Sequence, residues 1–154
     1  MKYFPFRKWV VSNNKKIPLS LHQIFWLKNR GRYFIPAIAW LITCTILLTL
    51  PASAFPSDNW YTKIPMWDKW IHIGLFSILC FLFCWGIFKV RMHEYSLKKN
   101  FIQTAICCLI YGILMELVQR YFIPNRRFDN GDVIADGVGS AAGLIYSLKR
   151  YVKK

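Results

Sequence analysis

The chain has 154 residues, of which 55% are hydrophobic and 18% aromatic, and its formal net charge is +14. This composition is too apolar for an ordinary soluble domain of that length. The basic residues lie between and outside the apolar blocks instead of alternating with aromatic residues on one surface, which argues against a nucleic-acid partner. Apolar blocks of about 18 or more residues predict helices that cross a membrane and contact its lipids.

The first 32 residues carry eight basic residues and no acidic residue. Apolar residues between Leu19 and Leu27 are interspersed among polar ones, which is typical of a helix that lies along an anionic lipid surface. A basic tail that only sets membrane topology has the same composition, and both interpretations remain open. We expect residues 1–32 to form a basic cytoplasmic segment and residues 33–154 to form a membrane domain.

The membrane domain is predicted to be an all-α bundle of four transmembrane helices. The expected spans are residues 33–50, 67–88, 101–122 and 132–148. The fourth is the least apolar, but Asp136 is the only carboxylate within 133–147. Its Gly139-x-x-x-Gly143 pattern lets membrane helices pack closely. The same two glycines can also join two copies of the chain, so a homo-oligomer is an alternative.

The distribution of basic residues predicts how the spans are oriented. Eight Lys and Arg residues precede the first span, four lie between the second and third, and four follow the fourth, against five in or beside the other connections. Cytoplasmic segments carry the excess of basic residues, so both termini are expected in the cytoplasm. The run Ala52-Ser53-Ala54 resembles a signal-peptidase site, but the long preceding span favours an uncleaved anchor.

With this orientation, six of the seven acidic residues belong to the non-cytoplasmic side. An ionisable group in lipid is costly unless it faces other helices, water or a partner. Asp68 and His72 are four residues apart on one helix face, and an imidazole beside a carboxylate suits proton transfer or metal binding. Glu116 and Gln119 similarly share a face of the third predicted helix.

The fourth predicted helix has the most regular pattern, with acids at its outer end and glycines at its inner end. The residues that follow steps of three and four along one seam are Asp129, Asp132, Asp136, Gly139 and Gly143. Docking through the glycines is expected to bring the carboxylates toward the second and third helices. Asp129 can instead cap the helix. Arg126 can anchor a phosphate or carboxylate, or extend toward lipid headgroups.

These motifs resemble those of the VanZ-like family over about residues 36–148. The matching stretches are DKWIH from Asp68, ELVQ from Glu116 and NRRFDNGDVIADGVGSAAG over 125–143. Asp136 stands where the family usually has Asn. An ionised Asp136 would strengthen a cation site, whereas a protonated one would donate a hydrogen bond.

The resemblance implies a multi-pass protein of the bacterial cytoplasmic (inner) membrane. Through the family's named member, it also implies a link to resistance against the glycopeptide antibiotic teicoplanin. It implies no established reaction.

Three functions are compatible with the polar residues. The first is binding or modification of an envelope component, either a lipid headgroup or a cell-wall precursor. The second is a hydrolase or transferase with His72 or Glu116 as general base. The third is a purely structural network between helices.

The residues expected to line the ligand pocket are Asp68, His72, Glu116, Gln119, Arg126, Asp129, Asp132 and Asp136. Those expected to hold a divalent cation such as Mg²⁺ or Ca²⁺ through oxygen atoms are Glu116, Asp129, Asp132 and Asp136.

Overall fold

A computed structural model describes residues 9–12, 15–18, 30–51, 65–90, 94–124 and 126–152 of the chain. The chain divides into two compact units, Met1–Arg32 and Tyr33–Lys154. The run Ala52-Ser53-Ala54 and the whole 19–27 stretch expected to lie along lipid fall outside the described residues. The structure therefore does not test either expectation.

The first unit contains a short antiparallel hairpin. Strand β1 (Trp9–Ser12) pairs with β2 (Lys15–Pro18), and Val10 lies opposite Ile17 in the register. β-branched residues favour strands. This hairpin was not predicted, because four-residue strands are too short to give a clear alternating pattern. The all-α expectation is therefore incomplete for this unit.

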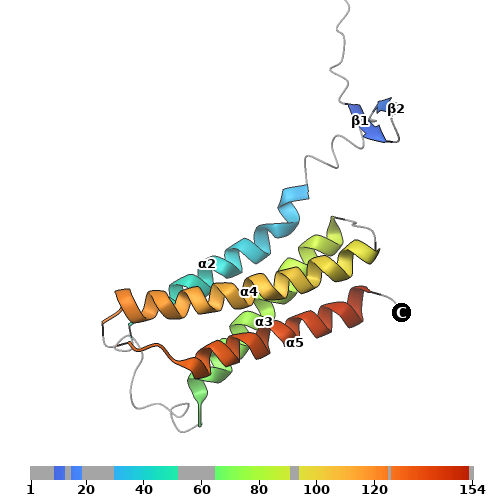
Figure 1. Ribbon diagram of the computed structural model, residues 1–154. Coiled ribbons are helices and arrows are strands. Elements are labelled where there is room, and N and C mark those ends of the chain that lie inside the picture. The colour runs from blue at the N-terminus through green and yellow to red at the C-terminus, as the bar shows by residue number, and fades with distance from the viewer. Residues whose placement is uncertain are drawn as a thin grey trace, which may run out of the picture. The chain divides into compact units, whose positions relative to one another are not determined.

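The second unit is made of four helices that lie side by side (Figure 1). A 3₁₀ turn, η1 (Arg30–Phe34), precedes the first of them. The helices are α2 (Ile35–Thr49), α3 (Trp67–Lys89), α4 (Glu94–Phe122) and α5 (Asn130–Tyr151). The predicted helical architecture of this unit is confirmed.

Three of the described helices are long and apolar enough to cross a membrane, which indicates a multi-pass membrane protein. The spanning segments are Gly31–Thr49, Trp67–Lys89 and Leu97–Phe122. α4 begins at Glu94, earlier than the predicted span over 101–122, because hydropathy marks only the apolar part of a helix. α5 does not reach the same hydropathy, since its carboxylates, serines and glycines dilute its apolar residues.

Helices α3 and α5 run in the same direction and pack closely through two glycines. A Cβ atom added at Gly139 would lie 2.5 Å from the carbonyl oxygen of Ile73, and one added at Gly143 would lie 2.5 Å from that of Ser77. The predicted docking of this seam is therefore confirmed. Within the described residues these two glycines lie against α3 of the same chain, and the alternative of a homo-oligomer is not tested.

Helices α2 and α4 run opposite to α3 and α5, so the end of one pair meets the start of the other. Gln119 Nε2 in the last turns of α4 donates a 2.7 Å hydrogen bond to the carbonyl oxygen of Leu48 near the end of α2. Between the helices the interior is apolar, with Phe76 and Phe101 fully buried. The outward surface is apolar as well, including Ile42 and Ile110, as expected for helices in lipid.

Candidate functional site

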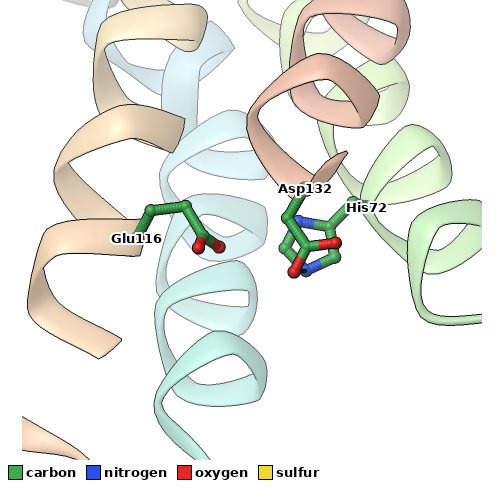
Figure 2. Close-up of side chains that lie close together, drawn as sticks. All are labelled: His72, Glu116 and Asp132. Atoms are coloured by element: carbon green, nitrogen blue, oxygen red, sulfur yellow. Dashed lines mark ion pairs between the residues drawn. The ribbon is translucent and has the colours of Figure 1, made fainter. Parts of the chain in front are cut away.

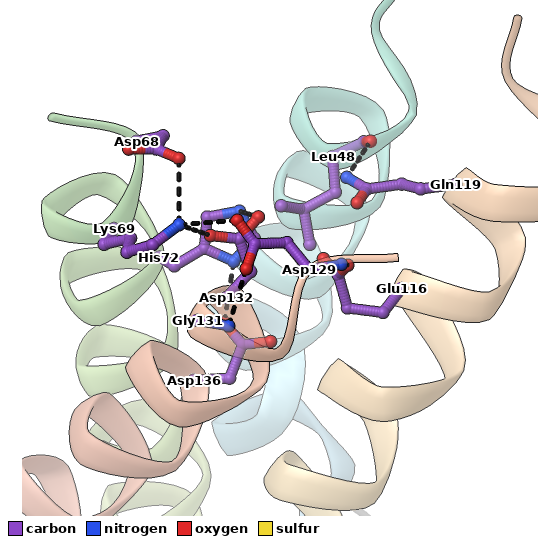
Figure 3. Close-up of polar contacts among 10 residues, drawn as sticks. All are labelled: Leu48, Asp68, Lys69, His72, Glu116, Gln119, Asp129, Gly131, Asp132 and Asp136. Carbon is purple, nitrogen blue, oxygen red and sulfur yellow. Dashed lines mark hydrogen bonds and ion pairs between the residues drawn. The ribbon is translucent and has the colours of Figure 1, made fainter. Parts of the chain in front are cut away.

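The polar residues gather at the end of the bundle where α3 and α5 begin and α2 and α4 end (Figure 3). Lys69, in the first turn of α3, is the central cation. Its Nζ atom lies 2.8 Å from Asp129 Oδ2, 2.9 Å from Asp132 Oδ1 and 3.1 Å from Asp68 Oδ2. One ammonium group therefore joins three carboxylates and fixes the start of α5 against the start of α3.

His72, one turn further along α3, is buried against α5. Its Nδ1 atom lies 2.8 Å from Asp136 Oδ1, within hydrogen-bond distance, and its Nε2 atom lies 3.8 Å from Asp132 Oδ2. An ionised carboxylate only accepts hydrogen bonds, so with Asp136 ionised the His72 Nδ1 is the donor. That tautomer leaves the lone pair of Nε2 directed toward Asp132.

Asp136 reaches this position because α4 offers a glycine opposite it. A Cβ atom added at Gly112 would collide with the Asp136 carboxylate. The side chain of Asp136 is 1% exposed. Gly112 therefore provides the space in which a second-turn carboxylate of α5 enters the bundle.

Glu116 contributes from α4 and is also enclosed. Its Oε2 atom accepts a 3.1 Å hydrogen bond from the backbone N–H of Asp129, the residue that caps α5. This contact ties the end of α4 to the start of α5. The other oxygen, Oε1, is buried and has no hydrogen-bond partner among the described residues.

Asp129 caps α5 and pairs with Lys69 at the same time. Its Oδ1 atom accepts a 2.6 Å hydrogen bond from the backbone N–H of Gly131, while Oδ2 faces Lys69. The Lys69 ammonium, followed by the Gly131 N–H, lowers the pKa of the Asp129 carboxyl. The two roles considered for Asp129, helix cap and cluster member, are both present.

Several polar atoms at and beside this end of the bundle are buried without a hydrogen-bond partner among the described residues. They are Glu116 Oε1, Asp136 Oδ2, Ser140 Oγ and Arg126 Nε. Buried polar atoms are ordinarily paired, and leaving one unpaired costs about 1–3 kcal/mol. The cluster therefore has hydrogen-bonding capacity that its described side chains do not use.

Most of the predicted site residues come together, but two details differ from the expectation. The carboxylate partner of His72 is Asp136 from α5, not Asp68, although Asp68 and His72 are four residues apart. Asp68 is 62% exposed and contacts Lys69 instead. A regular helix brings residues four apart to one face, but the stronger partners of a buried imidazole come from the neighbouring helix.

The second difference concerns Arg126. Its guanidinium makes no salt bridge to a described carboxylate, although it lies three residues before Asp129 in the chain and its Nε is buried. Arg126 therefore stands beside the cluster without joining its ion pairs.

Two groups of side chains place metal-ligating atoms within 4.8 Å of one another: His72, Glu116 and Asp132, and Asp68, Asp129 and Asp132. The set predicted for Mg²⁺ or Ca²⁺ is divided between them, and Asp136 belongs to neither because its Oδ1 faces His72. In the second group, the Lys69 ammonium already takes the position of a cation.

Lys69 is the main site residue that sequence reasoning missed. It is not among the residues predicted to line the pocket, although it lies within the DKWIH stretch that carries the family resemblance. The carbonyl group of Leu48 and the hydroxyl group of Ser140 were missed as well. Backbone groups carry no sequence signal, and serine is common where helices pack.

No protein-family model, no curated protein and no solved structure matches this chain.

Proposed function

We propose that this chain is a four-span protein of the bacterial cytoplasmic membrane, a member of the VanZ-like family, that binds the polar group of an envelope component. The ligand is a lipid headgroup or a lipid-borne cell-wall precursor in the outer leaflet. One observation carries the proposal: buried polar atoms at this end of the bundle have no partner among the described residues. A bound polar group would satisfy them.

The surface of α5 supports a fourth span. The helix has 22 residues. At about 1.5 Å per residue it is roughly 33 Å long, enough for a hydrocarbon core of about 30 Å. Its exposed side chains include Ile134, Val138 and Ile145, whereas its two carboxylates within the helix are buried. An apolar outside and a polar inside are what a spanning helix needs when it faces both lipid and a bundle.

Charge supports the orientation. The sequence has four basic residues between 89 and 100, four at 149–154 and eight before α2. Those in the described helices α3, α4 and α5, namely Lys89, Lys98, Lys99, Lys149 and Arg150, lie at the end of the bundle opposite the acidic cluster. The positive-inside rule puts these segments in the cytoplasm and the cluster at the outer surface. Trp67 and Trp70, beside the cluster on α3, suit the membrane–water interface at that surface.

The ligand chemistry follows from the unused groups. The guanidinium of Arg126 has no carboxylate partner among the described residues, and its buried Nε is unpaired there; it can hold a phosphate by two parallel hydrogen bonds. Glu116 Oε1 and Asp136 Oδ2 accept hydrogen bonds, so they suit hydroxyl or amine donors. An anionic headgroup that also carries hydroxyl or amine groups therefore fits best.

A groove near the start of α3 supports a lipid-borne ligand. It has a volume of about 310 Å³ and is lined by apolar side chains that include Trp40, Trp67 and Trp70. A Cβ atom added at Gly74, on its floor, would meet nothing within 4 Å. An acyl or isoprenoid chain can therefore lie along α3 on the same level as the polar cluster.

The convergence of the motif residues supports the family assignment. DKWIH, ELVQ and the acidic seam are separated in sequence, yet Lys69, Glu116 and Asp129 meet through direct contacts. With membership in that family comes the expectation that expression of the chain raises bacterial resistance to teicoplanin. Loss of that effect in Glu116→Gln would connect it to this cluster.

Lipid retention in nanodiscs tests the proposed binding. Full-length protein is placed in nanodiscs of a zwitterionic lipid, with either phosphatidylglycerol or undecaprenyl diphosphate added, and bound lipids are counted by native mass spectrometry. The wild type should retain one of the two anionic lipids preferentially. Retention of phosphatidylglycerol would identify the ligand as a lipid headgroup, and retention of undecaprenyl diphosphate would identify it as a cell-wall precursor. The Arg126→Gln variant should lose the bound lipid. The Arg127→Gln variant, which changes the exposed neighbouring arginine, should retain it. Equal retention in both variants would contradict the proposal.

A hydrolase or transferase is the second candidate, and the His72–Asp136 pair favours it. A carboxylate that orients an imidazole is the arrangement of a general base. The two candidates differ in turnover: an enzyme would convert the retained lipid and stop doing so in His72→Gln, whereas a binding module would return it unchanged.

A further inference from the structure

Three buried side chains from three different helices face one another at the inner side of the cluster. They are His72 of α3, Glu116 of α4 and Asp132 of α5, and each offers one ligating atom within 4.8 Å of the others (Figure 2). The arrangement joins an imidazole nitrogen and two carboxylate oxygens. That mixed set is chemically distinct from the all-oxygen site expected from the sequence.

The Glu116 side chain is held in place but only half satisfied. Oε2 is fixed by the backbone N–H of Asp129, whereas Oε1 has no partner among the described residues and the residue is 1% exposed. In Figure 2 the carboxylate extends from α4 toward Asp132 and His72. A buried carboxylate oxygen that is held in position and accepts no hydrogen bond can act as a ligand for a cation.

The two carboxylate oxygens of Asp132 also differ in their partners. Lys69 takes Oδ1 at 2.9 Å, so Oδ2 is left to face His72 Nε2 at 3.8 Å. That separation is too long for a hydrogen bond. It is close to the spacing of two ligands of one ion, since atoms about 2.1 Å from a tetrahedral Zn²⁺ are roughly 3.4 Å apart. The three ligating atoms, which lie within 4.8 Å of one another, would have to approach to about 3.4 Å to bind one ion.

His72 has the support that a metal-binding histidine ordinarily has. Its second ring nitrogen, Nδ1, lies 2.8 Å from the Asp136 carboxylate, which fixes the tautomer in which Nε2 can bind a metal. Asp136 is therefore a positioning residue for the imidazole, and it need not touch the ion.

The charge of the cluster also calls for a cation. Five carboxylates, those of Asp68, Glu116, Asp129, Asp132 and Asp136, surround one lysine and one histidine. Lys69 contacts three of the five carboxylates but not that of Glu116 or Asp136. Glu116 and Asp136 are buried, and an ionised carboxylate that is buried without a cation is costly inside a membrane bundle.

We infer that His72 Nε2, Glu116 Oε1 and Asp132 Oδ2 form a binding site for a divalent transition-metal ion such as Zn²⁺. Imidazole favours Zn²⁺ and its neighbours in the first transition row over Mg²⁺ or Ca²⁺. Three protein ligands leave a fourth position open, where a phosphate or water can bind. The site goes beyond the proposed envelope ligand, because an ion can bind without a lipid. The ion uses Glu116 Oε1, one of the acceptors offered to that ligand, so an ion and a lipid hydroxyl or amine group are alternative partners of this atom.

Cobalt spectroscopy tests this site. Full-length protein in detergent is stripped with a chelator and titrated with Co²⁺, whose visible absorption reports coordination by nitrogen and oxygen. One Co²⁺ per chain should bind, and Zn²⁺ should displace it while excess Mg²⁺ should not. Glu116→Gln should remove the Co²⁺ spectrum, whereas Glu94→Gln, which neutralises the first residue of the same helix, should leave it unchanged.

The positioning role of Asp136 has its own variants. Asp136→Leu should weaken Co²⁺ binding by about 10–100-fold, whereas Asp136→Asn retains an oxygen acceptor for the imidazole and should restore most of the affinity. Size-exclusion profiles and melting temperatures of the variants establish that they are folded. Binding by the wild type without one-to-one stoichiometry, displacement by Mg²⁺, or an unchanged spectrum in Glu116→Gln would overturn the inference. So would absence of Co²⁺ binding, and none of these results depends on lipid retention.

Discussion

The backbone carbonyl of Ile73 in α3 lies directly against Gly139 in α5, with no room for a side chain between them. This contact sets the depth at which α5 enters the bundle. Asp136 stands one turn before the contact, so its carboxylate is brought to His72 at 2.8 Å. The small residues of the seam and the carboxylates of the site are therefore parts of one arrangement.

Substitution of Gly139 by alanine should destabilise the bundle. The added methyl group forces the two helices apart, and overpacking of this kind costs about 1–3 kcal/mol. Gly137→Ala is the matched control, since a Cβ there would meet only Leu109 Cδ1, at an ordinary 3.6 Å. That control should be neutral or more stable by about 0.5–1 kcal/mol, because alanine favours a helix. Thermal unfolding in detergent measures both, and equal melting temperatures would contradict the proposed close approach.

The ion pairs of Lys69 should differ in strength according to burial. Asp132 is 8% exposed and Asp68 is 62% exposed, although both contact the same ammonium group. Double-mutant cycles with Lys69→Met should give a coupling of about 1–3 kcal/mol for Asp132→Asn. For Asp68→Asn the expected coupling is about 0–1 kcal/mol, since water screens an exposed pair. A larger coupling energy for Lys69–Asp68 than for Lys69–Asp132 would contradict the expectation that burial sets the strength of these ion pairs.

Acid should weaken the Lys69–Asp129 contact. The pKa of Asp129 is lowered in the folded protein, so its ionised form contributes stability above the ordinary value of 3.8, and that contribution is lost as the pH falls through the lowered pKa. Because this side chain is 47% exposed, the effect should stay below about 1 kcal/mol. Melting temperatures between about pH 5 and pH 3 should fall less steeply for Asp129→Asn than for the wild type. Parallel curves would rule out this contribution.

Gln119 should hold the end of α2 in place. Replacement of Gln119 by methionine removes the donor to the Leu48 carbonyl and leaves that buried oxygen unpaired, at a cost of about 1–3 kcal/mol. Gln103, exposed on the same helix, provides the control: Gln103→Met should change stability by less than about 0.5 kcal/mol. Guanidinium or thermal unfolding of the two variants measures both changes in stability. Unchanged stability in Gln119→Met would mean that the hydrogen bond to Leu48 does not stabilise the bundle.

The sequence was sufficient to predict the helices and the gathering of acids because lipid restricts where each can lie. Three spans follow directly from apolar length, and the acidic seam follows from steps of three and four on one helix. The glycine spacing also predicted that α5 docks closely, and Gly139 and Gly143 do lie against α3.

The individual contacts were not predictable in the same way. The pairing of His72 with Asp136, not with Asp68, depends on how far α5 is displaced along α3, which spacing within one helix does not specify. The central position of Lys69 was hidden because basic residues near a membrane surface have an ordinary role in topology. The hairpin β1–β2 was missed because its strands are too short to show a period.

The direct test of the account is whether α5 crosses the membrane with the acidic cluster outside. In a variant whose five cysteines are replaced by alanine, single cysteines are introduced at exposed Arg127, just before α5, and at exposed Lys149, in its last turn. Intact cells are treated with a membrane-impermeant maleimide. Arg127→Cys should be labelled in intact cells and Lys149→Cys only after permeabilisation. Labelling of both positions from one side, or the reverse pattern, would contradict the proposed topology and the outer-leaflet site.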